Sequence, residues 1–116
     1  MGRMSREKGK RGEREWAALC QSHGYGDARR TSQYCGNTGD ASDVVGLPGI
    51  HQEVKRVERL ELYSALKQAA RDAQEAGSGA IPIVAHRRNK ENWVVIMDAE
   101  DFFRLYSAWL EGLHHG

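Results

Sequence analysis

The order in which helical and strand-like segments follow one another most constrains how this chain folds. Apolar residues recur at helical spacing in three segments, residues 5–23, 59–77 and 98–113. Five shorter runs have strand-like sequence, residues 28–34, 43–47, 50–56, 80–88 and 92–97. The order helix, three strands, helix, two strands, helix predicts an α/β fold with one mixed β-sheet flanked by α-helices. A chain of 116 residues suits a single domain, residues 1–116.

The expected helix boundaries follow from capping residues. Ser5 is the expected N-cap of the first helix and Gly24 its stop, although two glycines, at positions 9 and 12, weaken its first turns. Gly77 ends the second helix and Asp98 caps the third. The apolar stripes of these two helices are residues 62, 66, 69 and 73 in the second, and Phe102, Tyr106, Trp109 and Leu113 in the third.

Glu13 is an acidic residue on the apolar side of the first helix. At 100° per residue it falls on the stripe of Trp16, Ala17 and Cys20, whereas Glu15 points about 160° away, toward solvent. A carboxylate that faces inward has no partner in an ordinary apolar core and is costly to bury there. Glu13 is therefore expected to belong to a polar site.

The strand IHQEVKR places Glu53 and Lys55 on one face, because side chains alternate along a strand. It follows the run DVVGL across a Pro-Gly turn, so the two runs predict a β-hairpin. A three-residue loop, Leu47–Gly49, or one β-bulge pairs Asp43 with Glu53, whereas a two-residue turn pairs Asp43 with Val54. A functional interpretation of the acids predicts the irregular hairpin.

Two carboxylates side by side in a partly buried site repel each other, and a bound divalent cation is the usual remedy. Asp43 and Glu53 offer the oxygen ligands that Mg²⁺ or Mn²⁺ prefers, and Lys55 beside them suits the activation of water for phosphodiester hydrolysis. The simpler alternative is an amphipathic edge strand with a Glu/Lys ladder on its surface. His51, on the same strand face, is a further candidate ligand or else a packed, hydrogen-bonded histidine.

The stretches KGKRGERE, SDVVG and QEVKR together resemble the PD-(D/E)XK nuclease superfamily, in particular archaeal-type Holliday-junction resolvases and related phage endonucleases. The similarity runs from about Lys8 to Ala73, and Ser42 stands in place of the proline in the family name. Beyond Gly77 only the pattern of strands and helix matches. The resemblance implies a restriction-endonuclease-like mixed sheet and a nuclease site.

The resemblance also assigns roles to individual residues. It implies that Glu13, Asp43 and Glu53, with the main-chain carbonyl of Val54, hold Mg²⁺, which Mn²⁺ can replace. Lys55 would be the catalytic lysine. Gln68 matches a glutamine that many members place on the helix after the Glu-x-Lys strand, although a plain surface residue is the alternative.

The net charge of +1 conceals an uneven distribution. Residues 1–14 hold six Lys or Arg against two Glu, while residues 98–116 hold four acids against one Arg. A basic segment of this kind either meets nucleic acid or is only a solvated end of a helix. Beside an acidic metal site, the flanking basic residues are expected to contact DNA phosphates. They are Lys8, Lys10, Arg11, Arg14, Arg29, Arg30, Arg56 and Arg59.

Other classes of protein are excluded by simple features. The sequence has no run of 18 apolar residues and no signal peptide, so a membrane protein is not expected and the location is expected to be cytoplasmic. Cys20 and Cys35 lie 15 residues apart without a CxxC motif, which indicates reduced, structural thiols.

The expected function is a Mg²⁺-dependent DNA endonuclease, resolvase-like and acting on branched DNA in recombination or repair. The alternatives are a less structure-selective phage or repair nuclease on the same fold, and a DNA-binding module that does not cut. The resemblance also implies a symmetric pair of subunits. The wide apolar surface of the last helix suits a homodimer, unless both sides of this helix are buried within one chain.

Overall fold

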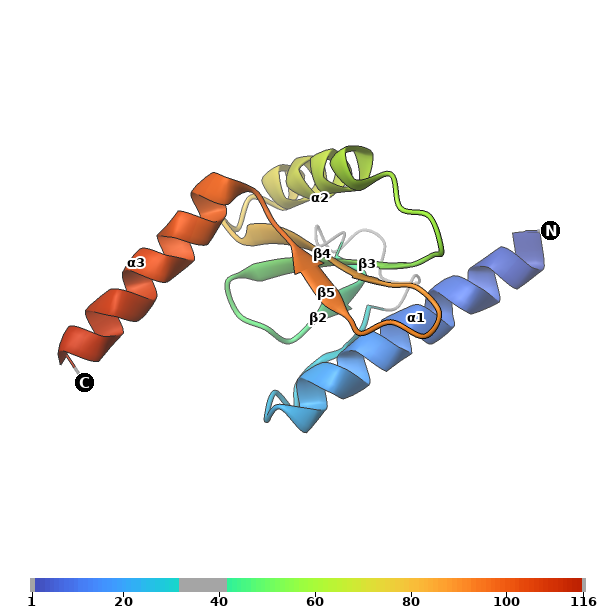
Figure 1. Cartoon of the computed structure of the whole chain (residues 1–116), viewed down its shortest axis with the longest axis horizontal. Coiled ribbons are helices and arrows are strands. Elements are labelled where there is room, and N and C mark those ends of the chain that lie inside the picture. Colours follow the sequence, from blue (N-terminus) through green and yellow to red (C-terminus); the bar gives the residue numbers. More distant parts are fainter. Residues whose placement is uncertain (1, 32–41, 116) are drawn as a thin grey trace.

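The structure of the chain, a computed structural model, describes residues 2–31 and 42–115 (Figure 1). In chain order the elements are α1 (Gly2–Ser22), β1 (Arg29–Arg30), β2 (Val44–Val45), β3 (Ile50–Arg56), α2 (Leu62–Ala76), β4 (Ile81–Arg87), β5 (Val94–Ile96) and α3 (Ala99–His115). The predicted order of helices and strands is therefore confirmed.

The strands of the described part of the chain form one five-stranded sheet in the order β1-β2-β3-β4-β5. β3 and β4 pair in parallel, from Ile50 opposite Ile81 to Arg56 opposite Arg87. The crossover between them contains α2, as a parallel pair requires. All other neighbouring strands pair antiparallel. The sheet is thus mixed, as the sequence predicted, and the fold is α/β.

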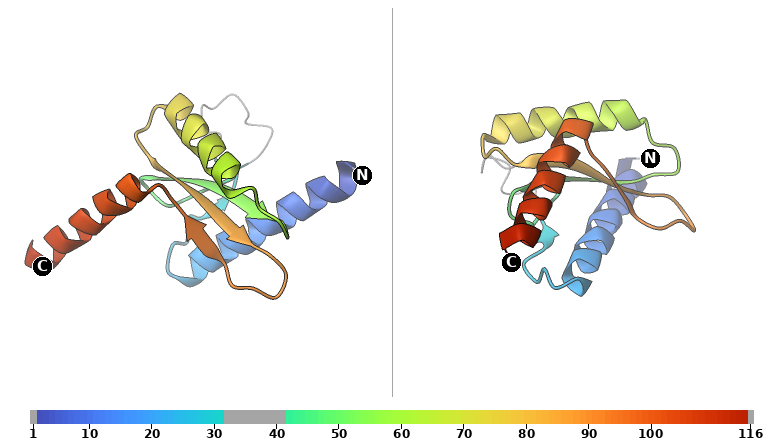
Figure 2. Two further views of the ribbon diagram at one scale, coloured as in Figure 1. Left: turned by 45° about the horizontal axis from the view of Figure 1, so that its top comes forward. Right: turned by 60° about the vertical axis from the view of Figure 1, so that its left-hand side comes forward.

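α1 and α2 cover opposite faces of the sheet, and alternation along β4 shows how (Figure 2). Ile83 and Ala85 belong to the apolar cluster that contains the inward residues of α1. Val84, between them, belongs to a second cluster with Ala65 and Ala69 of α2. Because β3 pairs in register with β4, each face of β3 is likewise directed toward a different helix.

A buried polar contact ties α1 to β3. The indole N–H of Trp16 donates to Oε1 of Gln52 across 2.8 Å, and Gln52 has no exposed surface. Trp16 also packs on Trp93, with ring centroids 5.3 Å apart. Cys20, beside this contact, is a free buried thiol whose pKa is raised by burial, in keeping with a structural role. Cys35 lies outside the described residues.

Two of the predicted helix ends are confirmed. Gly77 follows α2 in the left-handed conformation, with φ of 71°, and its N–H bonds back to Ala73 and Gln74. The carboxylate of Asp98 accepts a hydrogen bond of 2.9 Å from the N–H of Glu100, so Asp98 caps α3.

Three other sequence expectations need correction. α1 begins at Gly2, so Ser5 lies within the helix and does not cap it; the Arg and Met residues before it are good helix formers. On α2 the buried residues are Ala65, Ala69 and Ala73, whereas Leu62 is 39% exposed, because the small alanines form the line of contact with β4. The first expected strand is seen only as β1, and residues 32–34 lie outside the described part.

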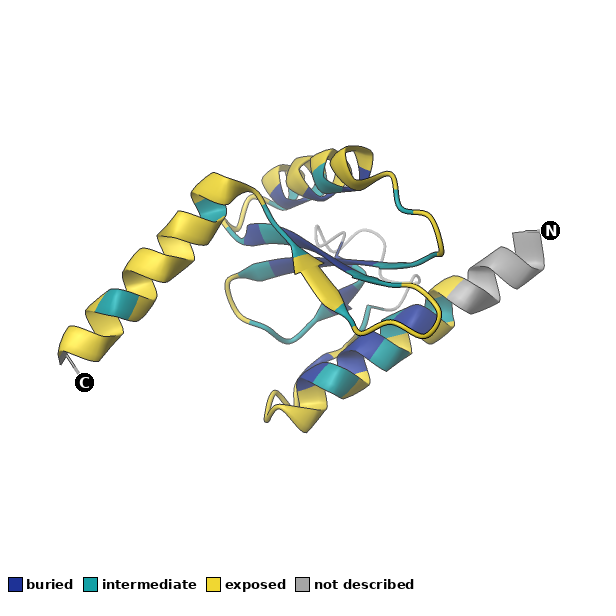
Figure 3. Cartoon of the chain, viewed as in Figure 1, coloured by how far each residue is buried: buried dark blue, intermediate teal, exposed yellow. Residues whose placement is uncertain are grey.

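α3 differs from the other helices because its apolar stripe is not covered (Figure 3). Phe102 is 49% exposed, Trp109 58% and Leu113 60%. The alternative that both sides of this helix are buried within one chain is therefore wrong. Despite this apolar surface, the described helices include none with the length and hydropathy needed to span a membrane.

The two glycines of α1 give a matched test of how the helix packs on β3. A Cβ atom at Gly12 would lie 2.5 Å from Cβ of Arg56, while one at Gly9 would meet nothing within 4 Å. We expect Gly12→Ala to lower the free energy of unfolding by about 1–3 kcal/mol through overpacking, despite its better helix propensity. Gly9→Ala should leave stability unchanged or raise it by up to about 1 kcal/mol. Urea denaturation of both variants measures the difference, and equal effects would contradict this packing.

Candidate active site

The hairpin that carries the predicted acids is irregular, as expected. Val44 pairs with Gln52, a register that leaves Leu47–Gly49 as the loop and, continued by one residue, sets Asp43 opposite Glu53. The N–H of Asp43 nevertheless donates to the carbonyl of Gln52 at 2.9 Å, not to that of Glu53, so the ladder is distorted at this point.

Gly46 is one reason why the hairpin takes this path. Its φ of 106° is accessible mainly to glycine, and a Cβ atom there would lie 2.4 Å from Cα of Ala28. The backbones of β2 and of the segment before β1 can therefore approach closely only with glycine at this position. Ile50 closes the loop by donating its N–H to the carbonyl of Leu47 at 3.0 Å.

The carboxylate of Asp43 lies at the junction of β2 and β3. Its Oδ2 accepts a hydrogen bond of 2.9 Å from the main-chain N–H of Val54. Burial, followed by the negative charge of Glu53, raises the pKa of Asp43 to about 7, while the Val54 bond and the charge of Lys55 oppose the rise. The structure therefore brings Asp43, Glu53 and Lys55 within electrostatic reach of one another.

Glu13 approaches the same site from α1, but it is not without a partner. The guanidinium Nε of Arg30 donates to its carboxylate at 2.7 Å, so the expectation that an inward Glu13 lacks a partner is wrong. Burial raises the pKa of Glu13, the hydrogen bond from Arg30 lowers it, and the charge of Asp43 raises it further. Glu13 is thus near Asp43, with Arg30 as its direct contact.

His51 forms a hydrogen-bonded chain with two neighbours. Its Nδ1 lies 2.8 Å from Oγ of Ser42, and its Nε2 lies 3.0 Å from Oε1 of Glu53. A neutral imidazole satisfies both contacts when Nε2–H donates to Glu53 and Nδ1 accepts from the Ser42 hydroxyl. The interpretation of His51 as a hydrogen-bonded histidine is confirmed, and its effect is to orient the carboxylate of Glu53.

Asp72 of α2 completes a second group of possible ligands that the sequence interpretation missed. Three possible ligand atoms, one each from His51, Glu53 and Asp72, lie within 4.8 Å of one another. Across the described residues this is the only trio of His, Cys, Asp or Glu that meets the distance, so Glu13 and Asp43 do not form such a trio with Glu53. The sequence feature that could have identified Asp72 is its position next to Ala73, which is buried on the inward side of α2.

The remaining predicted site residues take different positions. Lys55 is half-buried on β3, two residues from Glu53 and on the same face. Val54 is buried and contributes its N–H to Asp43; the role of its carbonyl as a ligand stays a prediction. Gln68 is exposed on α2, one helical turn before Asp72.

The basic residues expected to contact DNA fall into two groups. Arg11, Arg14, Arg29 and Arg59 are exposed, and Lys10 is half-buried; the side chain of Lys8 lies outside the described part. Arg30 and Arg56 are half-buried and form ion pairs within the protein. The exposed residues therefore suit an external phosphate better than the paired ones.

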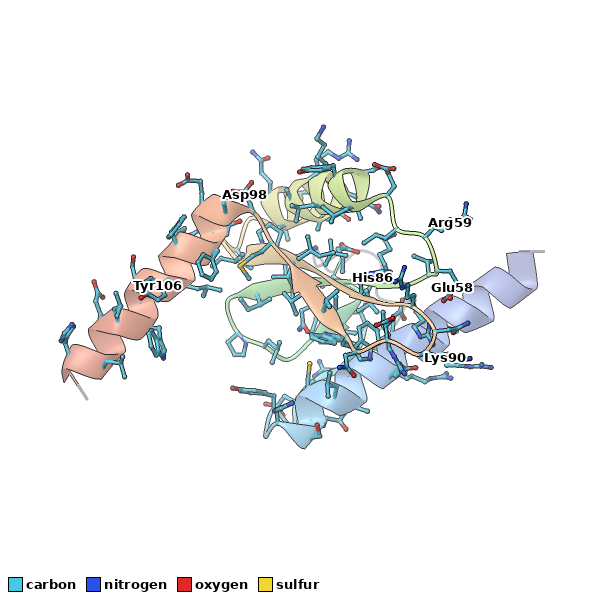
Figure 4. All side chains as sticks on the ribbon, viewed as in Figure 1. Glu58, Arg59, His86, Lys90, Asp98 and Tyr106 are labelled. Atoms are coloured by element: carbon cyan, nitrogen blue, oxygen red, sulfur yellow. The ribbon has the colours of Figure 1, made fainter. Side chains whose placement is uncertain are left out.

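Arg56 belongs to an ion-pair network that joins α1 to the sheet. Its guanidinium lies 3.7 Å from both Glu15 and Glu58 and donates to Oδ1 of Asn89 at 3.0 Å. Glu15 also pairs with Arg87. Glu15 is therefore not directed to solvent, because this side of α1 faces the basic ends of β3 and β4. Figure 4 shows Glu58 and Lys90 on the side of the sheet away from Asp98.

No protein family, no curated protein and no solved structure matches this chain.

The donor set fits a divalent cation. Asp43 and Glu53 face each other as two carboxylates in a partly buried position, and the raised pKa of Asp43 shows the cost of ionising both. A cation lowers that cost by neutralising the pair. Glu53 is common to this pair and to the trio with His51 and Asp72, so it would be the shared ligand in either arrangement. An oxygen-only pair suits Mg²⁺, whereas an imidazole ligand also suits Mn²⁺ or Zn²⁺.

The raised pKa of Asp43 predicts a pH dependence of stability in metal-free protein. Its pKa is about 7 when folded against an ordinary value of 3.8, so the folded state binds an extra proton between these values. The stability contributed by this group is full below about pH 4 and is lost as pH rises toward 7. Asp43→Asn should therefore be more stable than the wild type at pH 8, by at most about 4 kcal/mol, and similar to it at pH 4.

Thermal unfolding in EDTA at both pH values measures this effect. The exposed Asp27→Asn is the matched control and should follow the wild type. Added Mg²⁺ or Mn²⁺ should stabilise the wild type more than Asp43→Asn at pH 8, because a ligand of the native state stabilises by mass action. An Asn variant with the same pH dependence as the wild type would show that Asp43 does not carry this proton.

Proposed function

We propose that this chain is a metal-dependent DNA endonuclease that hydrolyses phosphodiester bonds, with Mg²⁺ as cofactor and branched DNA as preferred substrate. The observation that carries the proposal is the pairing of Asp43 with Glu53, with Lys55 on the same face of β3. The resemblance of the surrounding sequence to resolvase-like PD-(D/E)XK nucleases supports the substrate class. The α/β fold with a mixed sheet is compatible with it.

In this proposal each residue has a distinct task. Asp43 and Glu53 hold the cation, which when bound acidifies water and offsets negative charge on the scissile phosphate. His51 holds the carboxylate of Glu53 in place through a hydrogen bond of 3.0 Å. Lys55 orients the attacking water or stabilises charge on the phosphate.

Glu13 and the arginines lie around this centre. Glu13 is held by Arg30 and reaches Asp43 electrostatically, so it acts as a further ligand through water or as a support for Asp43. The exposed arginines at positions 11, 14, 29 and 59 contact phosphates and contribute affinity without reading bases. Gln68 and the Val54 carbonyl remain additional candidates.

A cleavage assay with a labelled four-way junction and a linear duplex of the same sequence tests the proposal and its rivals. Cleavage of the junction alone, dependent on Mg²⁺ or Mn²⁺, supports the resolvase-like activity. Equal cleavage of both substrates indicates a less selective nuclease on the same fold. Binding without cleavage under any divalent cation indicates a DNA-binding module and would sink the proposed activity.

The acidic pair should be essential for cleavage but not for folding. We expect Asp43→Asn and Glu53→Gln each to reduce the single-turnover rate by about 10² or more, because each removes a ligand of the proposed cation. Circular dichroism should show folded protein in both cases. Glu75→Gln, an exposed residue of α2, is the matched control and should cut normally. Full activity in both site variants would show that these acids are structural.

Lys55 separates catalysis from binding. We expect Lys55→Met to lower the single-turnover rate at saturating DNA by about 10² to 10⁴, while DNA affinity falls only modestly. Lys67→Met, at an exposed position of α2, is the control and should leave the rate unchanged. A normal rate for Lys55→Met at saturation, with reduced salt dependence of binding, would place Lys55 among surface cations.

A further inference from the structure

His51, Glu53 and Asp72 meet on the face of the sheet that α2 covers. Glu53 lies opposite Val84, which packs against α2, and His51 is on the same face two residues earlier. His51 is 2% exposed and Glu53 3%, so both side chains lie in the interior, while Asp72 is half-buried on α2. Their possible ligand atoms all lie within 4.8 Å of one another.

The two carboxylates of this trio have no basic side chain to balance them. Among residues 2–31 and 42–115, neither Glu53 nor Asp72 forms an ion pair with a lysine or an arginine; the ion-pair contact of Glu53 is with His51. Two carboxylates this close, one of them buried, repel each other, and a bound cation relieves the repulsion. The trio therefore offers a divalent cation both its ligands and an unbalanced negative charge.

The hydrogen bonds of His51 prepare its ring as a metal ligand. Nδ1 lies 2.8 Å from Oγ of Ser42, and Nε2 faces Glu53. When Nδ1 carries the proton, it donates to the Ser42 hydroxyl and Nε2 presents a lone pair toward Glu53. A histidine that binds a metal usually donates its other N–H to a nearby oxygen, which fixes the tautomer. Ser42 is placed to be that oxygen.

This donor set suits Zn²⁺ better than Mg²⁺. One imidazole nitrogen and two carboxylate oxygens are ordinary zinc ligands, whereas Mg²⁺ prefers oxygen alone. The ligands of a tetrahedral zinc ion stand about 3.3 Å apart at bond lengths of about 2.0–2.1 Å. Nε2 of His51 and Oε1 of Glu53 are already 3.0 Å apart, and the Asp72 carboxylate has to approach by at most about 1.5 Å.

We propose that His51, Glu53 and Asp72 form a Zn²⁺ site that competes with Asp43 for the carboxylate of Glu53. An ion on the α2 side draws Glu53 away from Asp43, and its charge repels a second cation beside it. Zn²⁺ and Mg²⁺ therefore weaken each other's binding by the same factor, as linkage requires. Zn²⁺ then inhibits the Mg²⁺-dependent cleavage, and only this last step rests on the proposed function.

Calorimetric titration of the chain with Zn²⁺, in the absence of DNA, tests the site directly. All proteins carry His114→Gln and His115→Gln, because two adjacent histidines can bind zinc themselves. We expect Asp72→Asn to weaken Zn²⁺ binding by more than about 100-fold, and Ser42→Ala by about 10- to 100-fold through loss of the hydrogen bond to the imidazole. Glu75→Gln, exposed on the same helix, is the matched control and should bind Zn²⁺ normally.

The same titration in saturating Mg²⁺ tests the competition. Mg²⁺ should weaken Zn²⁺ binding to the wild type by about tenfold or more. Asp43→Asn should bind Zn²⁺ as the wild type does without Mg²⁺, and should no longer respond to Mg²⁺. No Zn²⁺ binding by the wild type, or binding lost in Asp43→Asn but kept in Asp72→Asn, would overturn the site. Zn²⁺ affinity that is independent of Mg²⁺ would overturn the competition.

Cleavage of a four-way junction in Mg²⁺ tests the inhibition. Zn²⁺ at a concentration that fills the site should lower the wild-type rate by about tenfold or more, as the coupling of the two ions requires. For Asp72→Asn the ratio of rates with and without Zn²⁺ should stay near one. Equal inhibition of both proteins would overturn the inhibitory role. A chain that binds Zn²⁺ as described but never cleaves DNA would refute the proposed nuclease and leave the zinc site established.

Discussion

The hydrogen bond from the Val54 main chain to the Asp43 carboxylate fixes where β2 meets β3, and the candidate site depends on it. Side chains alternate along a strand, so a slip of one residue between β2 and β3 would turn Asp43 away from Glu53. The pairing of β3 with β4 separately holds Glu53 on the α2 face and Gln52 on the α1 face, where it accepts from the Trp16 indole. These two registers together set the position of the acids and the packing of α1.

The centre of β3 is unusually polar for a strand covered on both faces. His51, Gln52 and Glu53 are each 3% exposed or less, among buried hydrophobic residues that, apart from Trp16, are small or aliphatic. Their hydrogen bonds to Ser42, Trp16 and one another limit the cost of burial. Apolar residues of similar size would stabilise such a sheet more simply. Local departures of this kind concentrate at functional sites, which favours a chemical role for this strand.

Much of the fold was predictable from signals between residues that are close in the sequence. The β3 run, the Gly77 stop and the Asp98 cap depend on a few neighbouring residues, and all three were predictable. The sequence allowed two loop lengths, and the three-residue loop predicted the pairing of Asp43 with Glu53, because the length of the turn sets the register of the hairpin.

Other features depend on contacts between distant segments, which periodicity does not specify. Arg30 reaches Glu13 only because β1 lies beside α1 at the edge of the sheet. Asp72 approaches Glu53 only because the crossover lays α2 over β3 and β4. Likewise the stripe of α3 identified an apolar face, but not that this face would be left uncovered.

The uncovered helix follows from how the other elements share the sheet. α1 occupies one face through Trp16, Ala17 and Cys20, and α2 occupies the other through its buried alanines, so an aromatic helix that follows β5 has no remaining apolar face of its own chain to cover. Its stripe is therefore left exposed in the single chain. The candidate site takes all its ligands from the sheet and α2, so a change in the α3 stripe leaves Asp43, Glu53 and their neighbours intact.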